Sequence, residues 1–258
     1  MEDKGKNKII QSLARAMSIL EYLADCKGGD GLSNISRGLG LSKSTTHSLI
    51  STMEQLGYVH QDQISGKYAL GLKIFELGQV VHASMDLRTI AMPYLHSLAQ
   101  KYQETVHLAV LSRGEVVYID KVDSPHSIRI ISHVGGRNPA HCTGVGKVLL
   151  AGLPEEEMER VIRDKKLQRF TPNTVTDPVK LKAHLAKVRQ EGYAEDREEI
   201  EIGLSCVAAP LKNHRGVVIA AISLSGPTGR VANGNIHDLT TDVVDAARLI
   251  SAQLGYKD

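Results

Sequence analysis

A glycine-rich segment, residues 137–147, has the pattern closest to an anion site. It runs through Gly144 and Gly146 into an apolar stretch, and successive backbone N–H groups at a glycine-rich helix start can hold an anion. It is not a nucleoside triphosphate loop, because His141 stands five residues before Gly146 and Val148 occupies the magnesium-binding Ser/Thr position. A small carboxylate is the more modest expectation. Alternatively, the glycines only let a helix pack closely.

An acidic run, residues 195–201, contains five carboxylates and one arginine. If this run is a strand, alternation places Asp196 and Glu198 on one face and Arg197 and Glu199 on the other. A carboxylate that points inward can accept hydrogen bonds from the hydroxyl groups of a ligand. The alternative is a solvated sheet edge.

Hydroxyl and thiol groups are the remaining candidates for chemistry. Alternation places Ser223 and Ser225 on one face of a strand, where their hydroxyls could contact a ligand, although strand serines without a ligand are common. The three cysteines, Cys26, Cys142 and Cys206, have no paired spacing that would indicate a zinc site or a disulfide framework. We expect them to be reduced.

Small polar residues surround one lysine in the N-terminal part of the chain: Ser42, Lys43, Ser44, Thr45, Thr46 and His47. In a helix here, the inward stripe is Leu49, Ile50, Met53 and Leu56, and the outer face holds Lys43, Ser44, His47 and Ser51. The lysine and the free N–H groups of the first turn suit a phosphate, whereas the hydroxyls and the imidazole suit base edges. The alternative is a solvated helix face.

Charge gives this part of the chain little affinity for nucleic acid by itself. Residues 1–80 hold nine Lys or Arg against eight Asp or Glu, so phosphate contacts must come from local placement. The candidates are Lys6, Lys8, Arg15, Arg37, Lys43 and Lys67. A module this weakly basic should bind DNA usefully only as a dimer on paired half-sites.

The surrounding residues predict the elements that position this face. Apolar residues at helical spacing predict a first helix over residues 12–25, and Ser33 is expected to cap a short second helix. Ser42 caps the third helix, which is predicted to end at Gly57, and a hairpin follows over residues 58–70. Three helices and a hairpin in this order describe a winged helix-turn-helix, whose third helix enters the major groove.

Strand and helix patterns alternate in groups over the rest of the chain. The predicted strands are residues 105–112, 115–121, 127–132, 193–199, 205–212 and 216–225. The predicted helices are residues 72–84, 87–102, 145–151, 154–163, 178–190 and 235–254. These patterns favour an α+β fold, with an antiparallel sheet covered by helices. We expect a DNA-binding domain at 1–71, a linker helix at 72–85 and a second domain at 86–258.

The composition of the 258 residues excludes several classes of protein. Thirty-one Lys and Arg against 29 Asp and Glu give a formal net charge of +2, which excludes a polybasic tail protein and a strongly acidic one. Aromatic residues make up 4%, which argues against platforms that stack bases or sugars. The longest apolar run, residues 217–222, is too short to span a bilayer, and no secretory signal is visible. We expect a cytoplasmic protein without metal or cofactor.

Taken together, the motifs resemble the isocitrate lyase regulator (IclR) family of bacterial transcription factors. The motifs that carry the resemblance are LSKSTTH (41–47), LGYV (56–59), KYALG (67–71), GVGKVLLA (144–151), GLSCVAAP (203–210) and SLSGP (223–227). Further motifs are most similar to the branch that contains 2-keto-3-deoxygluconate repressors: ETVHL (104–108), VYIDKVDS (117–124) and RNP (137–139). One departure is Ser48, where the family commonly has arginine.

The resemblance implies a winged helix-turn-helix, a linker helix that dimerises, and a C-terminal effector-binding domain similar to a GAF domain. Family members act as dimers or tetramers on palindromic double-stranded operator DNA. The implied function is a repressor controlled by a small carboxylate, a sugar acid or keto acid. By matching motifs, the implied effector-binding residues are Ser127, Ile130, Asn138, Gly144, Val145, Asp196, Leu204, Cys206, Ser223 and Ser225.

Three other functions compete with this prediction. An enzyme would use Cys206 or Cys142 as a nucleophile on a small keto acid, but nothing near them beyond His141 suggests thiol activation. A metal sensor would use His133, His141 and Cys142, which lack the usual ligand spacing. A protein-binding adaptor would not bind DNA at all.

Overall fold

The computed structural model describes residues 9–83, 86–231 and 236–257. Its contacts divide the chain into two compact units, Met1–Met85 and Asp86–Asp258. Residues 84 and 85, at the end of the predicted linker helix, lie outside the described residues. None of the described helices is both long enough and apolar enough to cross a membrane.

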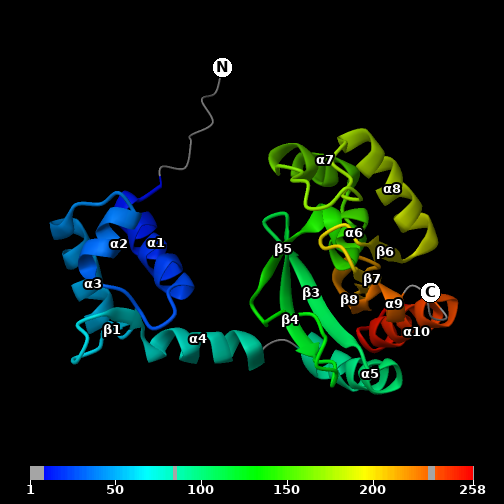
Figure 1. Cartoon of the computed structure of the whole chain (residues 1–258), viewed down its shortest axis with the longest axis horizontal. Helices are drawn as coiled ribbons and strands as arrows, with labels where there is room; N and C mark the ends of the chain where they lie inside the picture. The colour runs from blue at the N-terminus through cyan, green and yellow to red at the C-terminus, as the bar shows by residue number, and fades with distance from the viewer. Residues whose placement is uncertain (1–8, 84–85, 232–235, 258) are drawn as a thin grey trace. The chain divides into compact units, whose positions relative to one another are not determined.

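The N-terminal unit combines helices with a small hairpin (Figure 1). Its elements are α1 (Gln11–Asp25), α2 (Leu32–Gly38), α3 (Lys43–Gln55), β1 (Val59–Gln61), β2 (Tyr68–Leu70) and α4 (Leu72–Ala83). Ile19, Ile35 and Ile50, one from each of the first three helices, are fully buried against one another and against the hairpin. This arrangement confirms the predicted winged helix-turn-helix.

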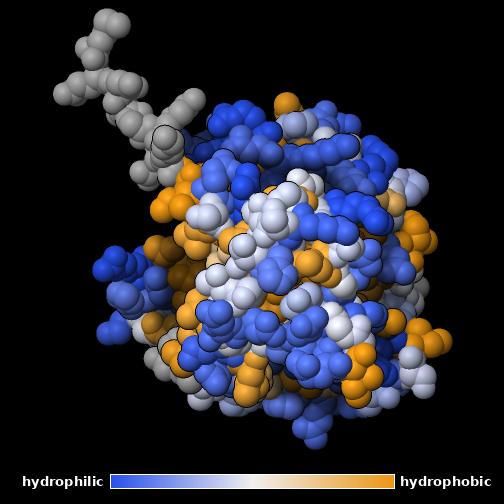
Figure 2. All heavy atoms as spheres, turned by 90° about the vertical axis from the view of Figure 1, so that its left-hand side faces the viewer, coloured by the Kyte–Doolittle hydropathy of each residue, from blue (hydrophilic) through white to orange (hydrophobic). Residues whose placement is uncertain are grey.

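Two details of this unit differ from the prediction. The N-cap of α2 is Gly31 and not Ser33, because the carboxylate of Asp30 accepts hydrogen bonds from Gly31 N–H and Asn34 Nδ2, each at 2.8 Å. Leu56, predicted to face inward, is the C-cap residue of α3 and is 60% exposed. In Figure 2, other apolar side chains lie among hydrophilic ones on the surface turned toward the viewer.

The second unit is built on a six-stranded antiparallel sheet (Figure 1). Its strands are β3 (Thr105–Ser112), β4 (Glu115–Val122), β5 (Arg137–Pro139), β6 (Ala194–Arg197), β7 (Leu204–Lys212) and β8 (Val218–Pro227). The order across the sheet is β5-β4-β3-β8-β7-β6, so β3 pairs with a strand from the end of the chain. The antiparallel α+β architecture is as predicted.

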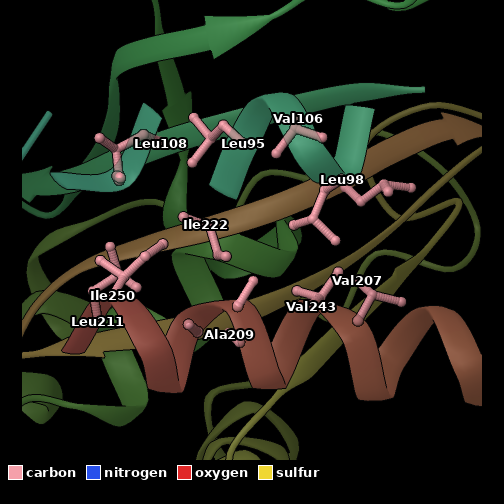
Figure 3. Packing of buried hydrophobic residues seen from close by; sticks show 14 of the residues in the cluster. Leu95, Leu98, Val106, Leu108, Val207, Ala209, Leu211, Ile222, Val243 and Ile250 are labelled. Carbon is pink, nitrogen blue, oxygen red and sulfur yellow. The ribbon is translucent and has the colours of Figure 1, made fainter. Parts of the chain in front are cut away.

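Helices cover both faces of this sheet. They are α5 (Asp86–Tyr102), η1 (Ala140–Cys142), α6 (Gly144–Ala151), α7 (Glu155–Asp164), α8 (Pro178–Glu191), α9 (Thr228–Val231) and α10 (Ile236–Gln253). Helices α5 and α10 pack on one face, where Leu108, Ile222 and Val207 meet Leu95 and Val243 (Figure 3). Helices α6, α7 and α8 cover part of the other face. The uncovered remainder of that face is available for a ligand.

The strand predicted at residues 127–132 does not form. These residues are irregular, and the free edge of β4 is occupied by β5 instead, with Val116 opposite Asn138. Gly135 N–H also donates to the carbonyl of Tyr118, which extends this pairing. The β-branched residues of 127–132 therefore have no strand to pair with. They form part of an irregular connection, residues 123–136.

Candidate functional site

The first turn of α3 presents polar side chains around a well-formed cap. Ser42 Oγ accepts the N–H of Thr45 at 3.1 Å and lies 2.8 Å from Thr45 Oγ1, so both hydroxyls are occupied within the turn. Lys43, Ser44 and His47 are exposed, which leaves a cation, a hydroxyl and an imidazole on the outer surface. This composition suits contacts to phosphate and to base edges.

The other residues predicted to contact DNA differ in exposure. Arg37 and Lys67 are exposed and Ser51 is half-buried, whereas Lys6 and Lys8 lie outside the described residues. Thr46 corrects the prediction, because its side chain is fully buried and its hydroxyl donates to the carbonyl of Ser42 at 3.0 Å. Thr46 points toward the core because it lies four residues before Ile50 on the same face of the helix.

A change from alanine to polar residues creates the second candidate site. On the face that α6 covers, Ala109, Ala194, Ala208 and Ala221 lie on four neighbouring strands under the helix. Two residues further along each of these strands, on the same face, lie His107, Asp196, Cys206 and Ser223. The alanines allow α6 to pack close to the sheet. The polar residues lie beyond the first turn of α6, where the helix no longer covers the sheet.

These polar residues line a cavity of about 240 Å³. Nine of the ten residues predicted from the family resemblance contribute to its wall: Ile130, Asn138, Gly144, Val145, Asp196, Leu204, Cys206, Ser223 and Ser225. Ser127 does not line the cavity and is exposed, because the strand that would have directed it inward is not formed. The structure thus brings together residues that are as far apart in the chain as Ile130 and Ser225.

Several further residues of the same wall were not predicted from the sequence. They are His107, Tyr118, Ile131, Ser132, His133, Gly136, Arg137, Thr143, Ile200 and Glu201. His107 lies directly opposite Ser223 in the pairing of β3 with β8, and its ring centroid is 4.7 Å from that of Tyr118. Asn138 Nδ2 donates to Tyr118 Oη at 3.1 Å. No local pattern singled out the first two, which the pairing of β3 with β8 and β4 brings to this wall.

Asp196 is a carboxylate of the cavity wall, a position that the family resemblance implied and that the alternation alone left open. Its side chain is 2% exposed, and burial raises the pKa of the carboxyl group from 3.8 to about 7. The N–H of Glu199 donates to Asp196 Oδ1 at 2.8 Å and partly offsets this rise. Near neutral pH the group can therefore offer a ligand either a proton or a negative charge.

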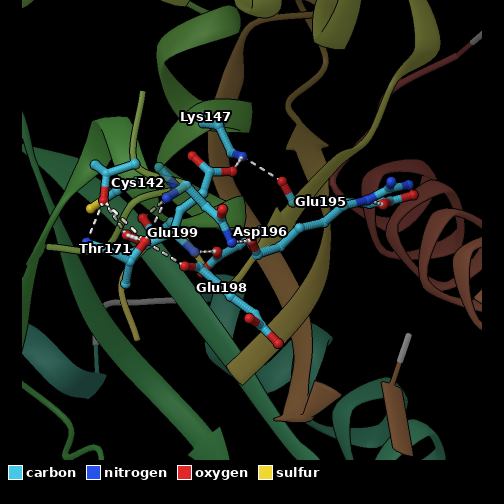
Figure 4. A network of polar contacts seen from close by, with 12 residues as sticks. Cys142, Lys147, Thr171, Glu195, Asp196, Glu198 and Glu199 are labelled. Atoms are coloured by element: carbon cyan, nitrogen blue, oxygen red, sulfur yellow. Dashed lines mark hydrogen bonds and ion pairs between the residues drawn. The ribbon is translucent and has the colours of Figure 1, made fainter. Parts of the chain in front are cut away.

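The predicted alternation fails beyond Asp196 (Figure 4). The strand ends at Arg197, and Glu198 adopts a left-handed backbone with φ of 61°, which turns the chain back on itself. Glu199 is consequently buried and bonds to Lys147 Nζ, and the same ammonium group also donates to the carbonyl of Glu195. Lys147 is fully buried on α6, so this buried ion pair connects the helix to the loop after β6.

The predicted anion cradle is smaller than expected. The N–H of Gly146 donates to Thr143 Oγ1 at 3.2 Å, because Thr143 caps α6. Gly144 and Val145 line the cavity, but Gly146 does not. A Cβ atom on Gly144 would lie 2.7 Å from Cys206 Sγ, and one on Gly146 would lie 2.3 Å from the carbonyl oxygen of Ala140. Close packing, the alternative considered for these glycines, therefore accounts for both.

The buried cysteines are unsuited to nucleophilic chemistry. Burial raises the pKa of the Cys206 and Cys142 thiols to about 12, with the charge of Asp196 adding to the rise, so both remain protonated near neutral pH. A thiol is a weak nucleophile compared with a thiolate. Among the described residues, no three His, Cys, Asp or Glu side chains are placed to hold a metal ion.

Replacing Asp196 by asparagine is expected to stabilise the protein increasingly as pH rises. The raised pKa means that the folded state favours the protonated acid, so this contribution to stability is complete below pH 3.8 and is lost as pH rises through about 7. Asparagine carries no charge at any pH and keeps an oxygen for Glu199 N–H. We expect a gain that approaches about 4 kcal/mol at pH 8 as an upper bound, measured by urea unfolding at pH 5 and pH 8.

The matched control is Asp177→Asn at the exposed N-cap of α8. Hydrogen bonds from the N–H groups of Lys180 and Val179 lower the pKa of Asp177 below 3.8, so its contribution to stability is complete above pH 3.8 and is lost only as pH falls below that value. Asp177→Asn should therefore differ from the unmodified chain by the same amount at pH 5 and at pH 8. If the free energies of unfolding of Asp196→Asn and of the unmodified chain change in parallel between pH 5 and pH 8, burial does not raise the pKa of Asp196.

Two family models match the chain, one for each unit. The IclR helix-turn-helix domain matches residues 12–63, and the bacterial transcriptional regulator IclR C-terminal domain matches residues 79–252. The first match contains the whole of α3, and the second contains every described residue that lines the cavity.

Relatives match over nearly the whole chain. The transcriptional regulator KdgR of Dickeya chrysanthemi is 40% identical, over 96% of this chain and 81% of its own length. XynR of Escherichia coli K12 is also 40% identical, over 96% of this chain and 98% of its own length.

Solved structures share the fold. The IclR of Thermotoga maritima has a TM-score of 0.75 at 33% identity, covering 96% of this chain and all of the other. An IclR homolog from Microbacterium hydrocarbonoxydans complexed with 4-hydroxybenzoate has a TM-score of 0.83 at 31% identity, covering 95% of this chain and 99% of the other. The chain therefore belongs to the IclR family of bacterial transcriptional regulators, with an N-terminal helix-turn-helix domain and a C-terminal effector-binding domain.

Proposed function

We propose that this regulator is a cytoplasmic repressor that binds operator DNA as a dimer and responds to a small hydroxylated carboxylate. The observation that carries the proposal is the cavity beside α6, which combines Asp196, Ser223, Ser225 and Asn138 in one wall. Relatives at 36% identity include the transcriptional repressor IclR and the repressor AllR, which supports repression as the output.

The cavity favours a small, polar guest. A volume of about 240 Å³ admits a molecule with few non-hydrogen atoms. Hydroxyls and amides from Ser223, Ser225 and Asn138 can bond to the oxygens of a sugar acid. The carboxylate lies at the first turn of α6, where Gly144 and Val145 line the wall and the positive end of the helix dipole favours an anion.

Exposed apolar residues of the N-terminal unit support the proposed dimer. Large apolar side chains remain exposed on two helices of this unit: Leu13 and Met17 on α1, and Leu72, Phe75, Leu77 and Val80 on α4. A second copy of the chain is the occupant that would cover these side chains and also supply the second recognition helix. Sedimentation of the full chain, alone and with operator DNA, separates a monomer from dimers and tetramers.

The test of the proposed function is an equilibrium titration on operator DNA. Effector control requires that the ligand bind one arrangement of the dimer better than another, because equal affinity for both shifts nothing. Adding 2-keto-3-deoxygluconate should lower the affinity of the full chain for its operator. A sugar acid shown to bind by calorimetry without any change in DNA affinity contradicts the coupling.

The exposed face of α3 gives a second prediction, in which Lys43 and Ser44 behave differently. Lys43→Ala should weaken binding to operator and random DNA alike and lower the salt slope by about 1 for each protomer bound, because it removes a phosphate contact. Ser44→Ala should cost about 1–3 kcal/mol on the operator and little on random DNA, because it removes a base contact. Fluorescence anisotropy at several salt concentrations measures both.

Lys180→Ala is the control, because this lysine lies on α8 in the other unit. It should leave both affinities and the salt slope unchanged. The same fractional loss on operator and random DNA for Lys43→Ala and Ser44→Ala is inconsistent with separate roles.

A further inference from the structure

His107 is a buried titratable group in the cavity wall that the preceding function leaves without a role. Its side chain is 2% exposed on β3, between Ser223 on β8 and the ring of Tyr118 on β4. Because it lies in the middle of the sheet, its ring has little freedom to turn toward solvent.

The two ring nitrogens of His107 have different surroundings. Nε2 lies 2.8 Å from Ser132 Oγ, whereas Nδ1 is buried and has no hydrogen-bond partner among the described residues. A buried nitrogen without a partner costs free energy, and native proteins generally pair such groups with protein, water or ligand. Since His107 lines the cavity, a bound molecule is well placed to supply the missing partner.

The partner of Nε2 connects His107 to the irregular connection that covers this side of the cavity. Ser132 lies in residues 123–136, and Ile130, Ile131 and Ser132 all line the wall. Lys121 Nζ donates to the carbonyl of Ser132 and also contacts Asp123 at 2.8 Å. Ser132 is therefore held twice, by its hydroxyl and by its carbonyl, while Ile131 beside it is 99% exposed.

The imidazole is neutral, which defines what it can bind. Burial and the charge of Lys121 lower the pKa of His107 to about 4, although Asp123 opposes the shift. A neutral ring offers one donor and one acceptor, and which nitrogen has the proton depends on the Ser132 bond. A ligand hydroxyl can donate or accept, so it satisfies Nδ1 in either tautomer, whereas a carboxylate can only accept. The neighbouring Asn138 amide is uncharged, and burial raises the pKa of the Tyr118 hydroxyl to about 12, so this group is uncharged near neutral pH as well.

We propose that Nδ1 of His107 binds a hydroxyl group of the effector and that the Nε2 bond to Ser132 links this contact to residues 123–136. His107 is then a specificity-determining residue that selects hydroxylated acids over bare keto acids. The proposal rests on the proposed function, because it concerns the same cavity and the same ligand class.

Two substitutions separate the two nitrogens. Asparagine places an amide atom near the position of Nδ1, and glutamine places one near that of Nε2. His107→Asn should keep the affinity for 2-keto-3-deoxygluconate within about threefold, whereas His107→Gln should lower it at least tenfold. Neither should change the affinity for pyruvate, which has no hydroxyl group. Calorimetry on the full chain measures all of these affinities.

Hydrogen exchange gives a readout that does not depend on the ligand. His107→Asn should raise exchange in residues 123–136 of the free protein, and His107→Gln should not, because only glutamine retains the Ser132 bond. Ser132→Ala, which leaves the sheet unchanged, should match the exchange of His107→Asn. This variant keeps the link testable if either His107 substitution fails to fold.

The outcomes distinguish this inference from the proposed function. If 2-keto-3-deoxygluconate binds and releases the operator but His107→Gln binds it as tightly as the unmodified chain, the role of His107 is wrong and the regulator function stands. Unchanged exchange in Ser132→Ala overturns the link to residues 123–136. If neither acid binds the unmodified chain, the proposed effector class fails and this inference fails with it.

Discussion

Replacing Lys147 by methionine is expected to lower the free energy of unfolding by about 3–5 kcal/mol, because it removes one partner of a buried ion pair. The lysine is fully buried on α6, and Glu199 would keep a buried carboxylate without its counter-charge. Glu199 Oε2 already lacks a hydrogen-bond partner within the described residues, so no second contact can compensate. Urea unfolding followed by circular dichroism measures the change.

Two further variants test the cause of this loss. Lys187→Met removes an ion pair of α8 whose lysine is 67% exposed, and it should cost less than about 1 kcal/mol. The double variant Lys147→Met/Glu199→Met buries no charge and should recover much of the lost stability. A Lys147→Met chain as stable as Lys187→Met would show that the pair does not fasten α6 to the loop after β6.

Replacing Gly146 by alanine is expected to destabilise the effector-binding unit by about 3 kcal/mol or more, the upper part of the range for overpacking. The added Cβ atom would lie 2.3 Å from the carbonyl oxygen of Ala140 and 2.4 Å from its Cα. Both are backbone atoms of η1, so no side chain can rotate away and the 3-10 turn itself must move. Thermal unfolding of the full chain measures the loss.

Gly78→Ala on α4 is the matched control. Gly78 is also a helical glycine, but an added Cβ atom there would meet no other atom within 4 Å. Alanine in a helix restricts the unfolded chain, so this variant should be as stable as the unmodified protein or gain up to about 1 kcal/mol. Equal effects of the two substitutions would mean that helix propensity, and not the contact with η1, determines the role of Gly146.

Local patterns were sufficient for most of the fold, because its elements are short and clearly bounded. Ser42 caps α3 and Gly57 follows its end with a φ of 80°, as expected from residue types alone. Side chains beside the predicted stripe were harder to place. Thr46 is polar but buried, and Leu56 is apolar but exposed. At the edge of an apolar stripe, the packing between helices determines whether a side chain is exposed.

The cavity was predictable where a strand directs the residue and where a family motif is present. Asp196, Ser223 and Ser225 lie on regular strands, where alternation predicts which neighbours share a face, and the family motifs implied that they bind the effector. Ser127 was expected from the family resemblance, but it does not line the cavity, because residues 127–132 form no strand and β5 occupies the edge of β4. His107 and Tyr118 were missed, because only the pairing of β3 with β8 and β4 brings them beside residues far away in sequence.

The Lys147–Glu199 pair shows what residue patterns could not supply. In the printed sequence Lys147 lies in an apolar helix and Glu199 in an acidic run, and nothing local relates the two. The two side chains meet because Glu198 adopts a left-handed backbone conformation. Residues other than glycine seldom adopt this conformation. Long-range contacts of this kind follow from the complete sheet.

The order of strands in the sheet bears on how the chain is synthesised. β3 needs β8 beside it, and residues 113–217 are made between the two, so the second unit cannot complete its central pairing until all of these residues have been synthesised. The described pairings of the N-terminal unit, such as Asp30 with Tyr68, join residues that lie closer together in the chain, and this unit is synthesised before the second one. A chain cut short before β8 would retain a module that recognises promoters while lacking the one that receives the metabolic signal.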